Sequence, residues 1–193
     1  MPIAELNNIL KSFPGPDAET TVTDLDKLSL TIESGHSIAI TGPSGSGKTT
    51  LLRILGTLDQ PTSGTMMMDG RDISQQNSTR LSWLRNRYIG FVFQQHHLLP
   101  QLTVIENVLL PVLPVDDKDL RKSSEERATH LLEAVGLKNY HHRYPGMMSV
   151  GECQRVAVVR ALINQPSLLL ADEPTGSLDA RNAMILSDLL VKL

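Results

Sequence analysis

The sequence predicts an α/β fold, because segments patterned as strands alternate with segments patterned as helices along its 193 residues. A glycine-dense turn at 42–49 lies between a β-rich segment and a segment with helical spacing. The apolar run 167–171 has the composition of a strand buried on both faces of a parallel sheet. At this length, one domain with a core of its own is expected.

Five segments are predicted as strands. Leu28 to Ile32 alternates apolar and polar residues, as a half-buried strand does. Asp69 and Gly70 directly follow another of the segments and predict a tight turn. The five segments are 28–32, 37–41, 65–68, 88–93 and 167–171.

Five helices are predicted from apolar spacing and from signals at their ends. Thr103, followed three residues later by Glu106, fits a capping box, and Gly136 fits a C-cap. The helix-rich middle of the chain is predicted to be an insertion into the α/β core. The predicted helices cover 49–58, 104–110, 123–135, 150–162 and 180–193.

Composition disfavours several classes of function. The formal net charge is −3 with no long basic run, and aromatic residues are only 4%, which argues against a nucleic-acid-binding surface. Cys153 is the only cysteine, so no intramolecular disulfide can form and a reducing compartment is compatible. No apolar stretch reaches the roughly 18 residues that a membrane-spanning helix needs. Action at a membrane would therefore need spanning helices from another subunit.

The glycine-dense turn has the chemistry of a phosphate site. Its glycines let backbone N–H groups turn inward around phosphate oxygens, and the following helix adds its positive N-terminal end. Lys48 is predicted to reach the β- and γ-phosphates of ATP, and the Thr49 hydroxyl to bind Mg²⁺. The alternative, a flexible glycine turn, is disfavoured by the position between a predicted strand and a predicted helix. The residues that satisfy the P-loop pattern are Gly42, Pro43, Ser44, Gly45, Ser46, Gly47, Lys48 and Thr49, with Thr50 next in the chain.

Two acidic residues follow the apolar run directly. Asp172 is predicted to bind Mg²⁺, directly or through water, as the Walker B acid does. Glu173 is placed to orient or deprotonate the attacking water. The pair could instead lie in a solvated loop, but an apolar strand that ends at paired acids is unusual without a cation.

With these residues in place, the sequence resembles the ATPase subunits of ABC transporters over essentially its whole length. Gln94, after Phe93 and between the two Walker motifs, looks like the Q-loop glutamine that senses Mg²⁺ and the attacking water. Asp179, in the run Ser177-Leu178-Asp179, looks like part of the D-loop at the dimer interface. Phe13 lies where the family places an aromatic residue that stacks on adenine, with a core phenylalanine as the alternative.

The family's signature, normally Leu-Ser-Gly-Gly-Gln/Glu, reads Met-Ser-Val-Gly-Glu at 148–152. By the resemblance, Ser149, Gly151 and Glu152 contact the γ-phosphate of ATP held by a partner subunit. Val150 replaces a glycine of the usual pattern. If this position needs a positive φ, the strain is of order 1–3 kcal/mol.

Within the family, the nearest likeness is to subunits of lipoprotein-releasing, macrolide-export and cell-division type transporters. It rests on the sequence at 55–59, 95–100 and 172–182, and the run His-His-Leu-Leu-Pro at 96–100 is especially like the lipoprotein-releasing branch.

The resemblance implies a P-loop NTPase (RecA-like) core with an N-terminal antiparallel β subdomain and an inserted helical subdomain. It implies one ABC ATPase domain over 1–193, C-terminally incomplete and divided into 1–94, 95–150 and 151–193. Catalysis is assigned to Glu173, Lys48 and Gln94, and Mg²⁺ binding to Thr49, Gln94 and Asp172. Two copies, or this chain and a second ABC ATPase, are expected to pair on ATP and drive integral membrane permease subunits from the cytoplasmic face of the inner (plasma) membrane.

Two other functions stay open. The family's switch histidine lies beyond the D-loop, whereas the chain ends at Leu193 and all six histidines precede the Walker B strand. An ATP-binding dimerisation module with little or no hydrolysis is therefore an alternative. A nucleic-acid-linked ABC ATPase is a weaker one, because the net charge opposes it and no basic arm is present.

Overall fold

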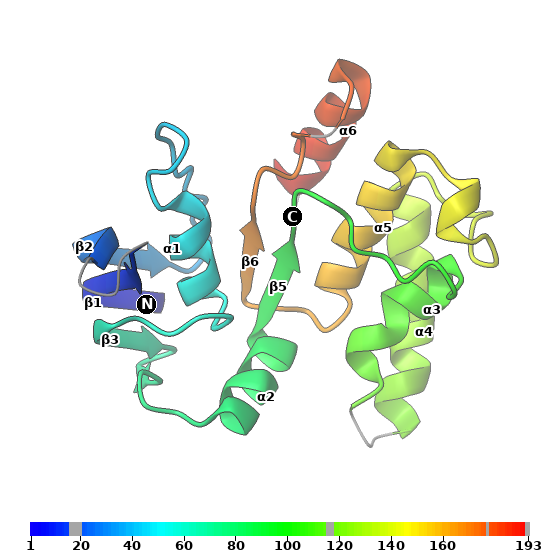
Figure 1. The fold of residues 1–193 in the computed structure, drawn as a ribbon. Helices are drawn as coiled ribbons and strands as arrows, with labels where there is room; N and C mark the ends of the chain where they lie inside the picture. Colours follow the sequence, from blue (N-terminus) through cyan, green and yellow to red (C-terminus); the bar gives the residue numbers. More distant parts are fainter. Residues whose placement is uncertain (16–20, 115–117, 177, 192–193) are drawn as a thin grey trace. The chain divides into compact units, whose positions relative to one another are not determined.

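The computed structural model describes residues 1–15, 21–114, 118–176 and 178–191 (Figure 1). Contacts divide the chain into two compact units, Met1–Arg85 and Asn86–Leu193. Each unit has its own secondary structure and its own buried side chains. The predicted subdomain boundaries at 94/95 and 150/151 stay a prediction.

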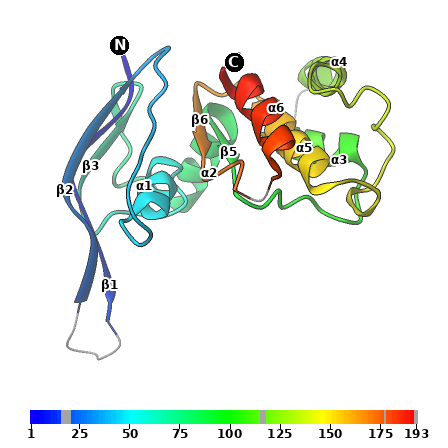
Figure 2. The same ribbon diagram turned by 90° about the horizontal axis from the view of Figure 1, so that it is seen from above.

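The first unit is built on a four-stranded antiparallel sheet in the order β2-β1-β3-β4. Its strands are β1 (Pro2–Pro14), β2 (Thr21–Glu33), β3 (Ser63–Met68) and β4 (Arg71–Asp72). The predicted strand at 28–32 lies within β2, and 65–68 lies within β3. Figure 1 shows β1 between β2 and β3, and in Figure 2 the two long strands β1 and β2 run alongside each other. The sheet is the antiparallel β subdomain that the resemblance implied.

Strand β1 was not predicted, because a bulge breaks its alternation. Ala4 and Leu6 are buried two residues apart, but the next buried residue is Ile9. The register with β2 shifts between Leu6 and Ile9, and Asn8 has φ 51°. One extra residue at a bulge moves the following side chains to the opposite face, which hides the strand period.

Helix α1 (Lys48–Leu55) begins directly after the glycine-dense turn, as predicted, and ends three residues earlier than predicted. Its apolar face, Leu51, Leu52, Ile54 and Leu55, is buried. Gly56 caps the helix by donating its N–H to the Leu52 carbonyl oxygen at 2.8 Å.

The turn between β3 and β4 confirms its prediction. Asp69 and Gly70 have φ values of 49° and 71°, and positive φ at both central residues is the mark of a type I′ hairpin turn.

One predicted strand is absent. Residues 36–43 have no regular secondary structure, and Ile38 is 46% exposed. A strand exists only through hydrogen bonds to a neighbouring strand, and within the described sheets no strand pairs with this segment. Residues 37–41 therefore form no strand, and the segment that leads into the P-loop has no regular secondary structure.

Helix α2 (Ser78–Tyr88) was also missed by the sequence analysis. Only Leu81 and Leu84 are buried on it, so its apolar stripe is too narrow to give a clear helical period. Tyr88 ends this helix, and the strand predicted over 88–93 is shorter, β5 (Ile89–Val92).

The second unit contains the parallel pair predicted from the apolar run. Strand β6 (Leu168–Ala171) pairs in parallel with β5, with Gly90 opposite Leu169. Gly90 is required here, since a Cβ atom would lie 2.5 Å from the Ala161 carbonyl oxygen of helix α5 (Val150–Leu162). Helix α6 (Ala180–Val191) packs on the same layer through Leu186, which is fully buried.

The helical part of the second unit follows β5, and Figure 1 shows α3, α4 and α5 close together. Its other elements are α3 (Val104–Leu109), the short 3-10 turns η1 (Leu110–Val112) and η2 (Pro145–Met147), and α4 (Lys118–Ala134). The Thr103–Glu106 capping box and the left-handed Gly136 after α4 are both confirmed. A cluster of buried side chains, including Val104, Leu132 and Val156, holds these helices together. Among the described residues, no helix combines the length and the apolar character needed to cross a bilayer.

Candidate nucleotide-binding site

The glycine-dense turn is held in place by strand β2. Gly47 has φ 81°, and a Cβ atom on it would lie 2.7 Å from the carbonyl oxygen of Asp24, so only glycine fits. Three residues on, the Thr50 hydroxyl donates a 2.8 Å hydrogen bond to the Asp24 carboxylate. Backbone and side chain of one β2 residue therefore fix both the end of the loop and the first turn of α1.

Lys48 lies over its own loop. Its ammonium group donates to the carbonyl oxygens of Gly42 and Pro43 at 3.0 and 2.9 Å. The loop residues 42–46 are exposed, as is Thr49 at the start of α1. A cation, accessible backbone and the positive end of a helix are thus gathered at one surface, which is the donor set that phosphate oxygens need.

Phe13 lies near the end of β1, opposite Val22 of β2. Its side chain is 37% exposed, so the interpretation as a core phenylalanine is wrong. The Lys11 ammonium lies 4.9 Å from the ring centroid and also forms a 2.8 Å ion pair with Asp59. The ring is therefore accessible on a supported strand, and its contact with adenine stays a prediction.

The two acidic residues lie at the carboxyl end of the parallel pair. The N–H of Asp172 donates to the Val92 carbonyl oxygen at 2.9 Å and so extends the pairing of β5 with β6. Beyond it, Glu173 is exposed and has φ 44°, and its carbonyl oxygen accepts from the Gly176 N–H. The Gln94 side-chain nitrogen approaches the Glu173 carboxylate to 3.4 Å. Residues 79 positions apart thus meet at the edge where parallel strands bind ligands.

The signature segment starts α5 with a capping box. The Ser149 hydroxyl accepts from the Glu152 N–H at 3.2 Å, and the Glu152 carboxylate accepts from the Ser149 N–H at 2.7 Å. The Tyr140 hydroxyl donates to the same carboxylate at 2.8 Å. The hydrogen bond from the Ser149 backbone, opposed by partial burial, lowers the pKa of Glu152, with smaller contributions from Tyr140 and Arg155. The Ser-x-x-Glu spacing was a visible signal for this cap that the sequence analysis did not use.

Val150 is the first residue of α5 and is 52% exposed. A helical residue does not need a positive φ, so the strain expected from the missing glycine does not arise. The departure from the usual signature therefore leaves the local backbone unstrained.

Two polar residues of α5 were missed, the buried Gln154 and the half-buried Arg160. Gln154 is fully buried and donates to the Phe93 carbonyl oxygen at 2.7 Å. Arg160 donates to the carbonyl oxygens of His96 and His97 at 2.7 and 2.8 Å, and burial lowers its pKa. Together they hold the two ends of the segment 93–97, which contains Gln94. Their signal in the sequence was polar side chains on the buried face of an apolar helix.

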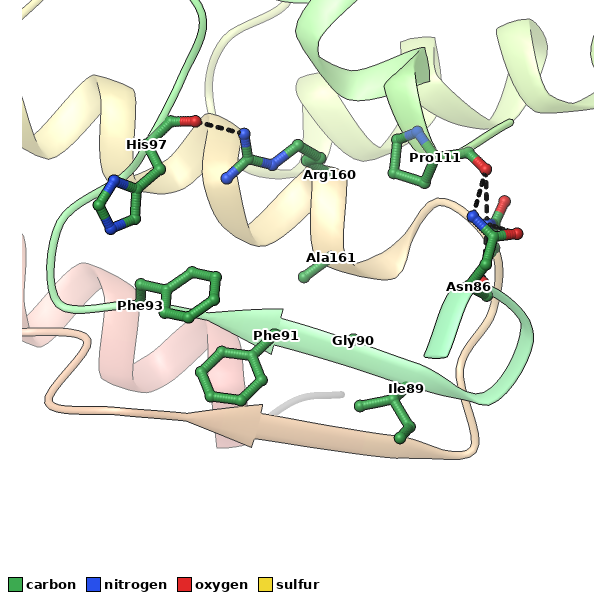
Figure 3. Close-up of a pocket in the computed structure, with 10 residues that line it drawn as sticks. Asn86, Ile89, Gly90, Phe91, Phe93, His97, Pro111, Arg160 and Ala161 are labelled. Atoms are coloured by element: carbon green, nitrogen blue, oxygen red, sulfur yellow. Dashed lines mark hydrogen bonds between the residues drawn. The ribbon is translucent and has the colours of Figure 1, made fainter. Parts of the chain in front are cut away.

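A hollow of about 350 Å³ lies beside this segment in the second unit. Figure 3 shows Phe91 and Phe93 on one side of it and Arg160 and Pro111 on the other. Phe91 and Phe93 are stacked, with ring centroids 4.2 Å apart, and are only partly buried.

The predicted residues therefore fall into two sets. Phe13 and the P-loop residues 42–50 belong to the first unit. The second unit brings Gln94 to Glu173, with Asp172 adjacent in the chain, and Gly151 to the segment that carries Asp179. Ser177, between Glu173 and Asp179, lies outside the described residues.

A P-loop that opens a helix, together with a carboxylate pair beside a glutamine at the end of a parallel strand, defines a P-loop ATPase. A model of the ABC transporter family matches residues 25–176, and the chain belongs to this family, as one of its ATP-binding subunits. The predicted family and fold are confirmed.

The proteins similar to this chain include ATP-binding components of ABC transporters. The lipoprotein-releasing system ATP-binding protein LolD of Shewanella frigidimarina is 51% identical over 164 residues, covering 85% of this chain and 68% of that protein. LolD of Blochmanniella floridana is 46% identical over 193 residues, covering 100% and 80%. Among solved structures, the dimer of MJ0796, a bacterial ABC transporter cassette, is 37% identical with a TM-score of 0.87, covering 98% of this chain and 82% of that one. A second MJ0796 dimer, in a post-hydrolysis state, holds ADP and Pi.

Proposed function

We propose that the chain binds Mg-ATP and hydrolyses it to drive lipoprotein release by membrane subunits. The observation that carries the hydrolytic part is the 3.4 Å approach of Gln94 to Glu173 at the carboxyl end of β5 and β6. Lipoprotein release is supported by LolD relatives that are 45 to 51% identical.

In this proposal the P-loop, residues 42–50, binds the phosphates and Phe13 stacks on adenine. Oxygen ligands suit Mg²⁺, and Thr49, Gln94 and Asp172 offer a hydroxyl, an amide and a carboxylate oxygen. The bound ion supplies neutralisation of phosphate charge. Glu173 orients the attacking water and accepts its proton, and Gln94 holds that water from the other side.

A second copy completes the site. Ser149, Gly151 and Glu152, together with Asp179, are proposed to meet the ATP held by the facing chain. The capping box supports this arrangement, because it holds Ser149 at the exposed start of α5. The dimers of MJ0796 support pairing of two such chains.

The hollow beside Phe91 and Phe93 is proposed to receive a helix of the membrane subunit. Stacked, partly exposed rings offer apolar area for a helix to bury. Arg160 keeps the wall of the hollow in shape through its two backbone hydrogen bonds. The chain would then act at the cytoplasmic face of the inner membrane.

The test is Mg-ATP binding and turnover by the purified chain and three variants. Glu173→Gln should keep binding and lower kcat by about 10²-fold or more, because the proton acceptor is lost. Lys48→Ala should weaken binding by about tenfold or more, because a charged contact to phosphate is lost. Glu126→Gln, exposed on α4, is the control for losing one carboxylate. Binding without turnover in the unsubstituted chain would favour the dimerisation module, and no binding would reject the proposal.

The transported substrate needs a separate measurement. With its membrane subunits in vesicles, the chain should release a lipoprotein to a soluble acceptor only when ATP is hydrolysed. ATP-dependent macrolide export without lipoprotein release would assign the chain to the other branch.

A further inference from the structure

Asn182 joins the signature helix to Asp179. Its side-chain nitrogen donates to one Asp179 carboxylate oxygen at 2.7 Å, and its backbone N–H donates to the other at 2.9 Å. Its side-chain oxygen accepts from the Arg155 guanidinium at 3.1 Å. One amide therefore connects a cation on α5 with a carboxylate at the start of α6.

The same side chain fills the space above Gly151. A Cβ atom on Gly151 would lie 2.7 Å from the Asn182 side-chain carbon Cγ and 2.9 Å from its oxygen. Real Cβ atoms do not approach this closely, so a larger residue at position 151 would displace the Asn182 side chain from its hydrogen bonds. The missing side chain of Gly151 thus makes room for the Asn182 side chain and lets α5 and α6 approach closely here.

Helix geometry explains why these residues meet. Gly151, Arg155 and Val158 follow one another at i, i+4 and i+7 on α5, and Asn182 and Leu186 follow at i and i+4 on α6. Val158 and Leu186 are both fully buried and pack in one cluster with Val92. The apolar contact sets the register of the two helices, and the polar contact lies one turn further towards their N-terminal ends.

We propose that Asn182 is a positioning residue that holds Asp179 and the first turn of the signature helix as one rigid element. The inference rests on the proposed pairing of two copies, in which both parts face the partner's ATP. Hydrogen bonds in a chain polarise one another. The hydrogen bond from Arg155 to the Asn182 oxygen therefore strengthens the hydrogen bond from the Asn182 nitrogen to Asp179. The two hydrogen bonds from Asn182 hold the pKa of Asp179 below its usual value, which agrees with a carboxylate that accepts on both oxygens.

The first experiment needs no nucleotide. Thermal unfolding is measured for Gly151→Ala, Asn182→Ala and the double variant. Gly151→Ala should lower Tm by several degrees, since about 1 kcal/mol corresponds to roughly 2–4 °C at this size. The double variant should lose clearly less than the sum, because removing the Asn182 amide makes room for the new methyl group. If the Tm loss of the double variant equals the sum of the two single losses, the proposed contact between Gly151 and Asn182 is wrong.

The second experiment measures ATP-dependent dimerisation by sedimentation in the Glu173→Gln background. Asn182→Ala should raise the dimer Kd by about tenfold, the effect of losing charged hydrogen bonds, while the Kd for Mg-ATP at low chain concentration stays unchanged. Asn182→Asp should raise the dimer Kd by at least as much. It keeps an acceptor for Arg155 but places a second carboxylate next to that of Asp179. Met184→Ala, 67% exposed on the same helix, is the matched control.

An unchanged dimer Kd in Asn182→Ala would overturn the positioning role. If the Glu173→Gln chain itself does not dimerise on Mg-ATP, the proposed pairing has failed and the positioning role fails with it. The unfolding measurement would then still decide whether Gly151 and Asn182 are coupled.

Discussion

The side-chain amide of Gln154 donates a 2.7 Å hydrogen bond to the backbone carbonyl oxygen of Phe93, 61 residues away in the sequence. Phe93 is the residue before Gln94, and Gln154 lies one helical turn after Gly151 on α5. The helix that begins with the signature is therefore attached directly to the segment that reaches Glu173.

Replacing Gln154 with Leu should destabilise the chain. The Phe93 carbonyl oxygen would lose its donor, the amide of the fully buried Gln154, which costs about 1–3 kcal/mol. Urea unfolding measures the loss, and Gln101→Leu at an exposed position should stay within about 0.5 kcal/mol. Equal stability of the two variants would show that the hydrogen bond contributes nothing.

Thr50→Val should weaken Mg-ATP binding by about fivefold, corresponding to about 1 kcal/mol. The substitution keeps the shape of the side chain but removes its hydrogen bond to Asp24, so the first turn of α1 loses its link to β2. Titration calorimetry gives the Kd. Thr50→Ser keeps the hydroxyl and should bind like the unsubstituted chain; a Ser variant as weak as the Val variant would point to lost packing instead.

Glu152 makes stability depend on pH in a defined direction. Its folded pKa lies below 4.5, the usual value of a glutamate, chiefly through the Ser149 backbone N–H. The ionised form is therefore stabilised by folding, an effect fully present above about pH 4.5 and lost as pH falls through the lower folded value. Glu152→Gln should lower the unfolding free energy at pH 7, and the difference should shrink below pH 4.5. A difference that does not change with pH would contradict this assignment.

Arg160→Met should loosen the segment after β5. The two carbonyl oxygens of His96 and His97 would lose charged donors, at a cost of about 1.5–3 kcal/mol each before relaxation. Hydrogen exchange at the Leu98 amide, which bonds to the His96 ring, should speed up. Arg160→Lys should rescue only in part, because one ammonium lacks the planar fork of the guanidinium. Unchanged exchange in the Met variant would rule out this role for Arg160.

Local signals in the sequence were sufficient for much of the fold. The cap at Thr103, the left-handed Gly136 and the turn at Asp69 and Gly70 depend on a few adjacent residues, and each was predicted. The strand at 37–41 was predicted wrongly, because a strand needs a partner that the segment itself does not specify. Strand β1 was missed because the bulge at Asn8 reverses its alternation.

In the candidate site, too, residues recognised by local spacing were predicted, and residues with distant partners were missed. The P-loop, Asp172 and Glu173 could be found because their spacing along the chain reflects their chemistry. Gln154, Arg160 and Asn182 could not, since their partners lie 61, 64 and 27 residues away. A buried polar residue in an apolar helix shows that a partner exists, but not which residue it is.

The ammonium of Lys48 is bound to two carbonyl oxygens of its own loop. Binding of a nucleotide there would exchange these hydrogen bonds for hydrogen bonds to phosphate. If the P-loop binds ATP as proposed, an arriving phosphate would replace these contacts before it gains any of its own. The measured enthalpy of binding is then a difference between two sets of hydrogen bonds, and association should be slower than encounter by diffusion. Until a phosphate arrives, Lys48 serves as the loop's internal ligand.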